Sequence, residues 1–263
     1  MHTIISLGGG VQSTLMALSI TKKYKMPELS ELLPNPIIIM ADTGSERPET
    51  MTYFKKYVRP QLIKDNIDFY VIRTKLGKLH EWYTKNSKIP FRVYRECTDK
   101  FKIQPIKSKI KQLGLYQKRG DKVTQALGIT TDEIQRVKPN RTTWINNIYP
   151  LIDIDYSRQD CINWYETHNL PVPIKSGCFC CPFQKKSEWI KLYQKHPQLI
   201  DLSIKMEQRA IKQNHNQSNY KISLVDNNTT LTQLIQNQKN QLSLDLFFDE
   251  YSSNDECSGS CFT

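Results

Sequence analysis

The sequence lacks any run of about eighteen or more apolar residues, and it is poor in glycine, with 10 in 263 residues. Without such a run, no segment predicts a helix that crosses a bilayer. Residues 1–5 carry neither a basic region nor a long apolar stretch, which argues against a secretory signal peptide. The mean hydropathy of −0.55 fits a soluble chain with its own core. We therefore expect a cytoplasmic protein without a membrane partner.

An acidic excess is also missing, because 37 Lys and Arg residues outnumber 26 Asp and Glu residues and the formal net charge is +11. Such a charge favours a polyanionic partner. Part of the excess is local, in the segment from Lys100 to Lys122, where the single acid is Asp121. The other cations there are Lys102, Lys107, Lys109, Lys111, Lys118 and Arg119. Two interpretations stay open: the segment holds tRNA or DNA, or it is a solvated face of a lysine-rich chain.

Strands and helices alternate along the first seventy residues. The apolar run at 36–40 suits a strand buried on both faces, and Pro48 stands where the first turn of a helix tolerates proline. We expect strands at 3–6, 36–40 and 68–73, with helices at 12–24 and 48–64. This alternation predicts an α/β fold with a parallel sheet and right-handed crossovers.

The pattern is weaker in the rest of the chain. We expect a basic helix or two at 97–115, a helix beginning at 131–136, a further strand at 148–154, and a helix at 157–168 capped by Ser157. Residues 212–241 are rich in Asn and Gln and are interpreted as a surface excursion or link. The expected domains are a nucleotide-binding domain at 1–200 and an irregular extension at 201–263.

A glycine-rich loop lies between the first expected strand and the helix that follows it. Consecutive residues without Cβ atoms let backbone N–H groups converge on an anion, and the helix N-terminus adds its dipole. The loop matches neither the Walker pattern nor Gly-x-Gly-x-x-Gly, and taken alone it is also compatible with a plain turn. The residues that we expect to bind the anion are Ser6, Gly8, Gly9, Gly10, Gln12, Ser13 and Thr14.

A second polar segment stands at the carboxyl end of the next expected strand, where open α/β sheets bind ligands. It reads Ala-Asp-Thr-Gly-Ser-Glu-Arg-Pro-Glu-Thr, and its candidate nucleotide-binding residues are Asp42, Thr43, Gly44 and Arg47. Together the two segments resemble the PP-loop family, the adenine nucleotide α-hydrolases. Gly9, Gly10 and Ser13 match the usual Ser-Gly-Gly-x-Asp-Ser loop, whereas Gly8 replaces its Ser and Gln12 replaces its Asp.

The resemblance extends over roughly residues 1–196. Asp42-Thr43-Gly44, the later Pro-Glu-Thr, and Leu170-Pro171 before the cysteines look more narrowly like phosphoadenosine phosphosulfate reductases. A phage- and prophage-associated branch of that family shares the Gly-Gly-Gly-Val-Gln-Ser-Thr loop and the cysteine pattern. The resemblance implies a Rossmann-like, HUP-type sheet, a helical cysteine-bearing C-terminal part, and an adenine nucleotide such as ATP with Mg²⁺. Gln12 is a neutral and weaker magnesium ligand than Asp.

Seven cysteines in a chain without an export signal argue against a disulfide framework and favour metal or sulfur chemistry. Cys178 and Cys181 form a Cys-x-x-Cys pair, and Cys97 lies upstream. This arrangement is similar to that of cluster-bearing sulfonucleotide reductases, and Cys161 or Cys180 could supply a fourth thiolate. A 4Fe–4S cluster is preferred over Zn²⁺. The alternative is buried free cysteines that pack as small hydrophobes.

Two more cysteines, Cys257 and Cys261, lie near the C-terminus, and Glu256-Cys257 resembles the catalytic tail of the reductases. A tail thiol could act at the nucleotide site, or the terminus could be frayed. Histidines form no spaced ligand pair. Guanidinium groups bind phosphate or sulfate in a bidentate manner, so the further candidates are Arg47, Arg92 and Arg95. Cys257, Cys261 and Arg95 are the expected catalytic residues.

Three functions remain open at this point. In the first, an enzyme adenylates a nucleic acid with release of pyrophosphate, for sulfur or nitrogen transfer, with a sulfur donor protein as a possible partner. In the second, a reductase of phosphoadenosine or adenosine phosphosulfate releases sulfite. In the third, a non-catalytic module binds the nucleotide.

Overall fold

The computed structural model describes residues 2–214, 222–226 and 228–241. The chain forms two compact units. Unit 1 comprises residues 1–82 and 95–178, and unit 2 comprises residues 83–94 and 179–263. Each unit is described by itself below.

Unit 1 is built on a five-stranded parallel sheet with the order β3-β2-β1-β4-β5. The strands are β1 (Thr3–Ser6), β2 (Pro36–Ala41), β3 (Phe69–Ile72), β4 (Val123–Ala126) and β5 (Ile145–Ile148). β1 is central and pairs with both β2 and β4. The carboxyl ends of parallel strands meet at one edge, which is where open α/β sheets bind ligands.

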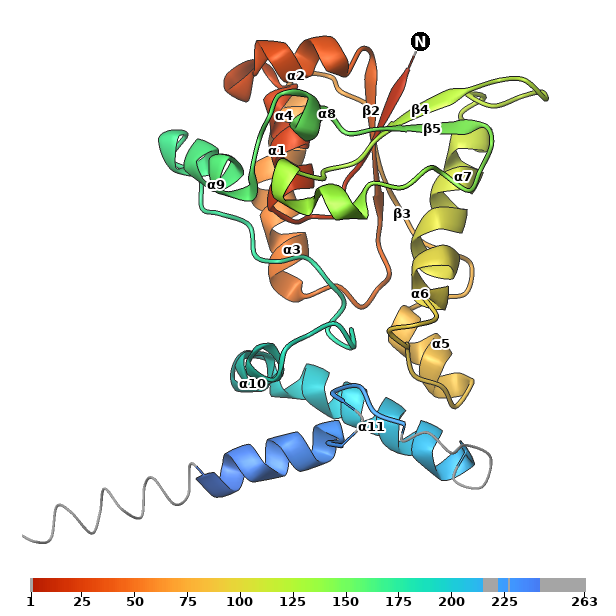
Figure 1. The fold of residues 1–263 in the computed structure, drawn as a ribbon, viewed down its shortest axis with the longest axis vertical. Helices are drawn as coiled ribbons and strands as arrows, with labels where there is room; N and C mark the ends of the chain where they lie inside the picture. The colour runs from red at the N-terminus through yellow and green to blue at the C-terminus, as the bar shows by residue number, and fades with distance from the viewer. Residues whose placement is uncertain (1, 215–221, 227, 242–263) are drawn as a thin grey trace, which may run out of the picture. The chain divides into compact units, whose positions relative to one another are not determined.

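Helices cover both faces of this sheet (Figure 1). Side chains alternate along β2, so that Ile38 and Met40 join one core cluster and Ile37 and Ile39 join the other. The first face carries α1 (Val11–Ser19), α2 (Pro27–Leu32), α3 (Pro48–Tyr53), α4 (Arg59–Lys64), α8 (Pro150–Asp153) and α9 (Arg158–Thr167). The second carries α7 (Gln104–Gln112), which buries Ile106 and Ile110. The apolar run at 36–40 is therefore buried from both sides.

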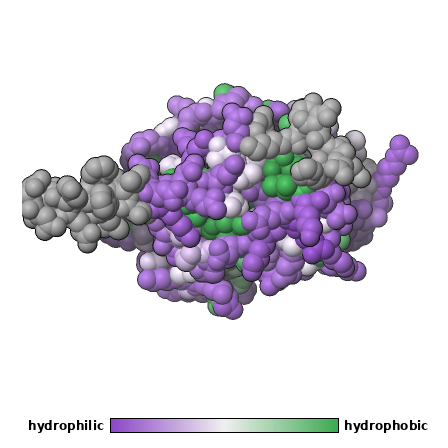
Figure 2. Space-filling model, turned by 90° about the horizontal axis from the view of Figure 1, so that it is seen from below, coloured by the Kyte–Doolittle hydropathy of each residue, from purple (hydrophilic) through white to green (hydrophobic). Residues whose placement is uncertain are grey.

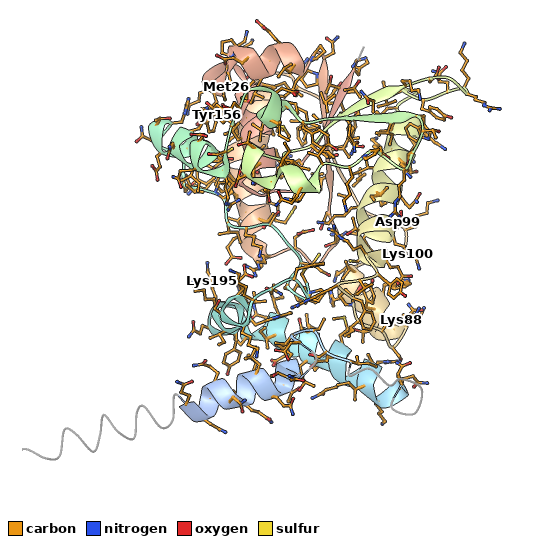
Figure 3. All side chains as sticks on the ribbon, in the orientation of Figure 1. Met26, Lys88, Asp99, Lys100, Tyr156 and Lys195 are labelled. Carbon is orange, nitrogen blue, oxygen red and sulfur yellow. The ribbon has the colours of Figure 1, made fainter. Side chains whose placement is uncertain are left out.

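Short helical turns complete unit 1. A π-helical turn, Phe54–Val58, joins α3 to α4, and another, Asp99–Ile103, joins α6 (Glu96–Thr98) to α7. Figure 3 labels Asp99 and Lys100 in the second of these turns. The 3-10 turns are Lys22–Tyr24 and Thr131–Arg136, and α5 (Leu79–Lys85) ends beyond the boundary of unit 1.

Unit 2 is helical. It contains α10 (Lys186–Lys195), α11 (Pro197–Asn214) and a helical stretch at 231–241. Trp189, Ile200 and Met206 are fully buried, and so are Leu224 and Leu231 from beyond α11. The carboxylate of Glu207 is also buried and accepts hydrogen bonds from the backbone N–H groups of Leu224 and Leu231, both at 2.8 Å.

The fold class is confirmed, together with the first three strands and the helix capped by Ser157. The strand predicted at 148–154 is wrong, because β5 ends at Ile148 and Pro150 begins α8. The predicted irregular extension also differs from the structure, since α11 continues to Asn214 and residues 231–241 are helical. The unit boundary falls at Cys178, rather than at residue 200.

The surface is mostly polar on the face drawn in Figure 2, with small hydrophobic areas between hydrophilic side chains. Across the described residues, no helix has both the length and the apolar character that a membrane span requires.

Candidate functional site

The glycine loop leads from the end of β1 to the start of α1 and has a defined shape. The backbone N–H of Gly8 donates to the Ser13 hydroxyl at 3.1 Å. Gly9 has a φ of 74°, and a Cβ there would lie 2.4 Å from Cγ2 of Thr50. Gly10 caps α1 in an extended conformation, without a side chain over the helix end. The first turn of α1 therefore carries backbone N–H groups without a side-chain cap, the kind of helix start at which anions bind.

Segments that are distant in the sequence pack against this loop. A Cβ on Gly10 would lie 2.9 Å from the Ser176 hydroxyl, and a Cβ on Gly128 would lie 2.7 Å from the backbone nitrogen of Ser13. The hydroxyl of Tyr165 in α9 donates to the carbonyl of Val11 at 2.7 Å. These contacts hold the start of α1 in one position.

Gln12 connects the loop to two charged side chains that the sequence analysis did not identify. Its amide nitrogen donates to Glu133 at 3.2 Å, and its amide oxygen accepts from the guanidinium of Arg158 at 3.3 Å. A carboxylate in its place would gain attraction from Arg158 and repulsion from Glu133. Arg158, at the start of α9, brings a permanent positive charge beside the loop.

The Asp-Thr-Gly segment follows β2 at the same edge of the sheet. Asp42 accepts from the backbone N–H of Gly44 at 2.7 Å and pairs with Arg73 at 2.5 Å. Gly44 has a φ of 66°, and a Cβ there would lie 2.7 Å from the side chain of Lys78. The segment is thus held by a turn, and the Asp42 carboxylate is already engaged by two donors.

His80, which the sequence analysis did not select, lies near the Asp-Thr-Gly segment. Its Nδ1 lies 2.9 Å from the hydroxyl of Ser45, which also accepts from the His80 backbone N–H at 3.0 Å. Burial lowers the pKa of His80, so the neutral imidazole is favoured. These bonds fasten the start of α5 to the Asp-Thr-Gly segment.

Glu46 lies at the centre of a polar cluster in unit 1. Its side chain is 3% exposed, and Lys102 lies 3.4 Å from its Oε1. The Thr43 hydroxyl donates to the same oxygen at 3.1 Å and lies 3.2 Å from Sγ of Cys178. Cys178 also pairs with Glu46 through an isolated backbone bridge. This places one predicted ligand, Cys178, beside the predicted nucleotide residue Thr43.

The predicted metal ligands do not assemble among the described residues. Cys161 is buried in the hydrophobic core beside Trp164 and Tyr165, and its burial raises the pKa of the thiol to about 12. Cys161 thus packs as a small hydrophobe in the core, and its role as a fourth ligand stays a prediction. Cys180 is likewise buried.

Cys97 and Cys178 belong to unit 1, whereas Cys181 belongs to unit 2. Within 2–214, 222–226 and 228–241, no group of three or more His, Cys, Asp or Glu side chains could hold a metal ion. A cluster or zinc site therefore stays a prediction, and we assign no chemical step to it. Cys257 and Cys261 lie outside the described residues.

The candidate arginines occupy different environments. The backbone N–H of Arg47 donates to the carbonyl of Gly177 at 3.3 Å, beside the polar cluster. Arg95 is exposed at the start of α6. Arg92 belongs to unit 2, where it donates to the carbonyls of Pro182 and Val225 at 2.8 and 2.9 Å. Arg92 therefore has a structural role in place of the predicted phosphate contact.

The fold defines a parallel α/β protein with a glycine loop at the carboxyl edge of its central strand. Residues 2–174 match the model of the phosphoadenosine phosphosulfate reductase domain, and the chain belongs to this family, within the PP-loop superfamily. The match covers most of unit 1 and ends before unit 2 resumes at Phe179.

Comparison with individual proteins gives more distant similarities. A curated relative, an uncharacterized protein of Methanocaldococcus jannaschii, is 24% identical over 190 residues, covering 67% of this chain and 44% of the relative. The chain thus spans less than half the length of that relative.

Two solved structures are also similar. Phosphoadenylyl-sulfate reductase from Candida auris, in complex with phosphate, has a TM-score of 0.46 and 14% identity, with 66% of this chain and 75% of that one covered. The U34-tRNA thiolase NcsA from Methanococcus maripaludis, with its 4Fe–4S cluster, has a TM-score of 0.39 and 16% identity, with 90% and 80% covered.

Proposed function

We propose that this protein binds ATP, or a related adenine nucleotide, with its phosphates at the N-terminus of α1, and that it adenylates an acceptor. The observation that carries the proposal is the loop itself. Gly9 and Gly10 place no Cβ in the loop, the Ser13 hydroxyl accepts from the Gly8 N–H, and no side chain caps the helix. Such a helix start suits the negative charge of a triphosphate.

The charges beside the loop support the same ligand. Residues 7–14 contain no carboxylate, and the guanidinium of Arg158 reaches Gln12. We expect Mg²⁺ to arrive with the nucleotide, because Asp42 and Glu46 are engaged by Arg73 and Lys102. Bound Mg²⁺ would neutralise phosphate charge, while the protein supplies the backbone N–H groups and Arg158.

The proposed step is a substitution at the α-phosphorus. An acceptor oxygen forms a bond to that phosphorus, the bond to the β-phosphate bridging oxygen breaks, and pyrophosphate leaves with the electron pair. The acceptor proton passes to solvent. A sulfur or nitrogen nucleophile can then displace AMP from the adenylated acceptor, forming the new bond to the acceptor carbon.

A nucleic acid is the acceptor class that we favour. The net charge of +11 and the cations at 100–122 support a polyanion. Cys257, Cys261 and Arg95 remain predicted participants in the later transfer, and a sulfur donor protein remains a predicted partner.

Family membership favours a second candidate, the reduction of a sulfonucleotide. In that reaction a cysteine thiolate, for which Cys257 is the candidate, attacks the sulfonate sulfur, and the S–O bond to the nucleotide breaks. A second thiol then releases sulfite by forming a disulfide with the first.

One set of product assays separates the candidates. Release of pyrophosphate from ATP, stimulated by tRNA or DNA, supports adenylation. Release of sulfite from either sulfonucleotide, with a dithiol as reductant, supports the reductase and refutes adenylation as the main activity. Binding of ATP by equilibrium dialysis without either product indicates a non-catalytic module. A broad band at about 400 nm in an anaerobic absorbance spectrum identifies an iron–sulfur cluster, whereas bound zinc without that band excludes the cluster.

A further inference from the structure

We propose that unit 1 binds a single-stranded nucleic acid on a surface at the C-terminal end of α7, here called the α7 face. It consists of Lys111, Tyr116, Lys118, Arg119, Lys122 and Trp144. The proposal rests on the proposed function and assigns a surface to its acceptor. The α7 face joins an aromatic pair supported by the core to nearby cations, and α7 runs from it toward the polar cluster around Glu46.

The aromatic pair at the centre of the α7 face is stacked. The ring centroids of Tyr116 and Trp144 lie 4.3 Å apart, with an angle of 22° between the ring planes. Both side chains are half-buried and pack against the core cluster that contains Ile110 and Ile145. The core thus supports rings that are partly open to solvent, which is the arrangement on which unpaired bases stack.

Lys111 lies beside the two rings, and further cations follow in the next loop. Nζ of Lys111 lies 5.6 Å from the centroid of Tyr116 and 5.8 Å from that of Trp144. Lys118, Arg119 and Lys122 are exposed in the following loop. Lys122 donates to the carbonyl of Thr143 at 2.5 Å, which ties this loop to the residue before Trp144. Rings and positive charges therefore share one surface.

The acid in the loop is engaged by the backbone. Asp121 accepts from the N–H groups of Gln117 and Lys118 at 2.8 and 2.9 Å, and these bonds lower the pKa of its carboxyl group. Asp121 thus shapes the turn that presents Lys118 and Arg119. The net charge of the α7 face stays positive. The face therefore favours a partner that carries phosphates over a partner with an acidic or neutral surface.

The helix that carries Lys111 also reaches the nucleotide site. Lys102, in the π-helical turn before α7, lies 3.4 Å from Glu46. Lys109, between the two, lies 3.9 Å from the ring centroid of Tyr70. The helical residues 99–112 rise by about 20 Å, the length of roughly six stacked nucleotides. A strand held on the α7 face can therefore extend along α7 to the polar cluster around Glu46.

The test compares two triple variants of the full chain that change the net charge equally. Lys111→Glu, Lys118→Glu and Arg119→Glu alter the α7 face. Lys55→Glu, Arg59→Glu and Lys64→Glu alter exposed positions on the π-helical turn and α4, which pack on the other face of the sheet. Fluorescence anisotropy measures binding of labelled oligo(U), oligo(dT) and a DNA duplex, each about 12 nucleotides per strand.

We expect the α7-face variant to bind the single strands at least about tenfold more weakly than the matched control. Its slope of log affinity against log salt should also fall by about 2, because three phosphate contacts are lost. Trp144→Ala should lower affinity roughly tenfold while Trp144→Phe retains it, since phenylalanine still stacks. Where alanine unfolds the protein, the comparison of the two triple variants still decides the test.

Preference for oligo(U) or oligo(dT) identifies RNA or DNA, and both support the proposal. The proposal is overturned if the two triple variants lose affinity equally, or if the duplex binds as tightly as the single strands. Pyrophosphate release from ATP is measured in parallel, with and without tRNA or DNA as the acceptor. Binding that depends on the α7 face without ATP turnover refutes the proposed function alone, whereas turnover with unaffected binding refutes the surface alone.

Discussion

Substitution of Gly9 by alanine tests the geometry of the anion loop, because two separate costs arise at this position. The φ of 74° lies in the left-handed region, where an L-residue with a Cβ costs about 1–2 kcal/mol. The new Cβ would also lie 2.4 Å from Cγ2 of Thr50, which is buried. Overpacking of this kind costs about 1–3 kcal/mol. We expect a total loss of about 2–5 kcal/mol.

Gly77 supplies the matched control. Its φ of 84° is similar, but a Cβ there would meet no atom within 4 Å. Gly77→Ala therefore isolates the backbone cost, and we expect it to lower the free energy of unfolding by about 1–2 kcal/mol. At about 2–4 °C per kcal/mol, thermal unfolding resolves the two variants. Equilibrium dialysis with ATP should show a loss of more than about tenfold for Gly9→Ala and little change for Gly77→Ala.

A double-mutant cycle with Thr50→Ser completes the test, because serine lacks the Cγ2 that the new Cβ meets. The combination with Gly9→Ala should recover about 1–2 kcal/mol relative to the sum of the single changes. Equal destabilisation by Gly9→Ala and Gly77→Ala, with no coupling to Thr50, would refute the close approach of the loop to α3.

Three further predictions concern other parts of the chain. Arg158→Ala should weaken ATP binding by roughly tenfold, because a charge-assisted contact is lost, whereas Arg59→Ala, at an exposed position on α4, should leave it unchanged; equal affinities of the two variants in equilibrium dialysis would contradict a phosphate role for Arg158. Burial raises the pKa of Glu207, so the unfolded state releases this proton first and the free energy of unfolding should fall as pH rises from 4.5 toward the raised value. Glu207→Gln should reduce the pH dependence of the free energy of unfolding over that interval, measured by urea titrations at several pH values. An unchanged pH dependence would show that another group is responsible. Ser157→Ala removes the side chain that accepts from the Asp160 N–H and should cost about 1 kcal/mol in thermal unfolding, with Ser108→Ala in α7 as a near-neutral control.

The fold was predictable where apolar character and periodicity agree. β2 has an apolar residue at nearly every position, so its burial on both faces is visible in the sequence. β4 reads Val-Thr-Gln-Ala and carries no such signal, although all four residues are buried. Gln125 is accommodated there because its amide donates to the Ser6 hydroxyl at 2.5 Å. A polar bond between neighbouring strands cannot be read from local sequence.

The loop and the Asp-Thr-Gly segment were predictable because each is continuous in the sequence. Glu133 and Arg158 were not, since they lie far along the chain from Gln12 and reach it through the fold. Cys161 did offer a signal, because Trp164 and Tyr165 follow it at helical spacing on the face that enters the core. That periodicity favours packing over metal binding.

The position of Gly128 has a consequence for synthesis of the protein. The backbone of Gly128 packs so closely against Ser13 that a Cβ would lie 2.7 Å from the Ser13 nitrogen. The strand just before it, β4, completes the pairing of the central strand β1. Since translation proceeds from the N-terminus, β1 and the loop leave the ribosome more than a hundred residues before these supports. A nascent chain that ends before β4 therefore holds the nucleotide loop without the walls that shape it. Under the proposed function, capture of the nucleotide and the stabilisation that it provides would begin only after that strand has been made.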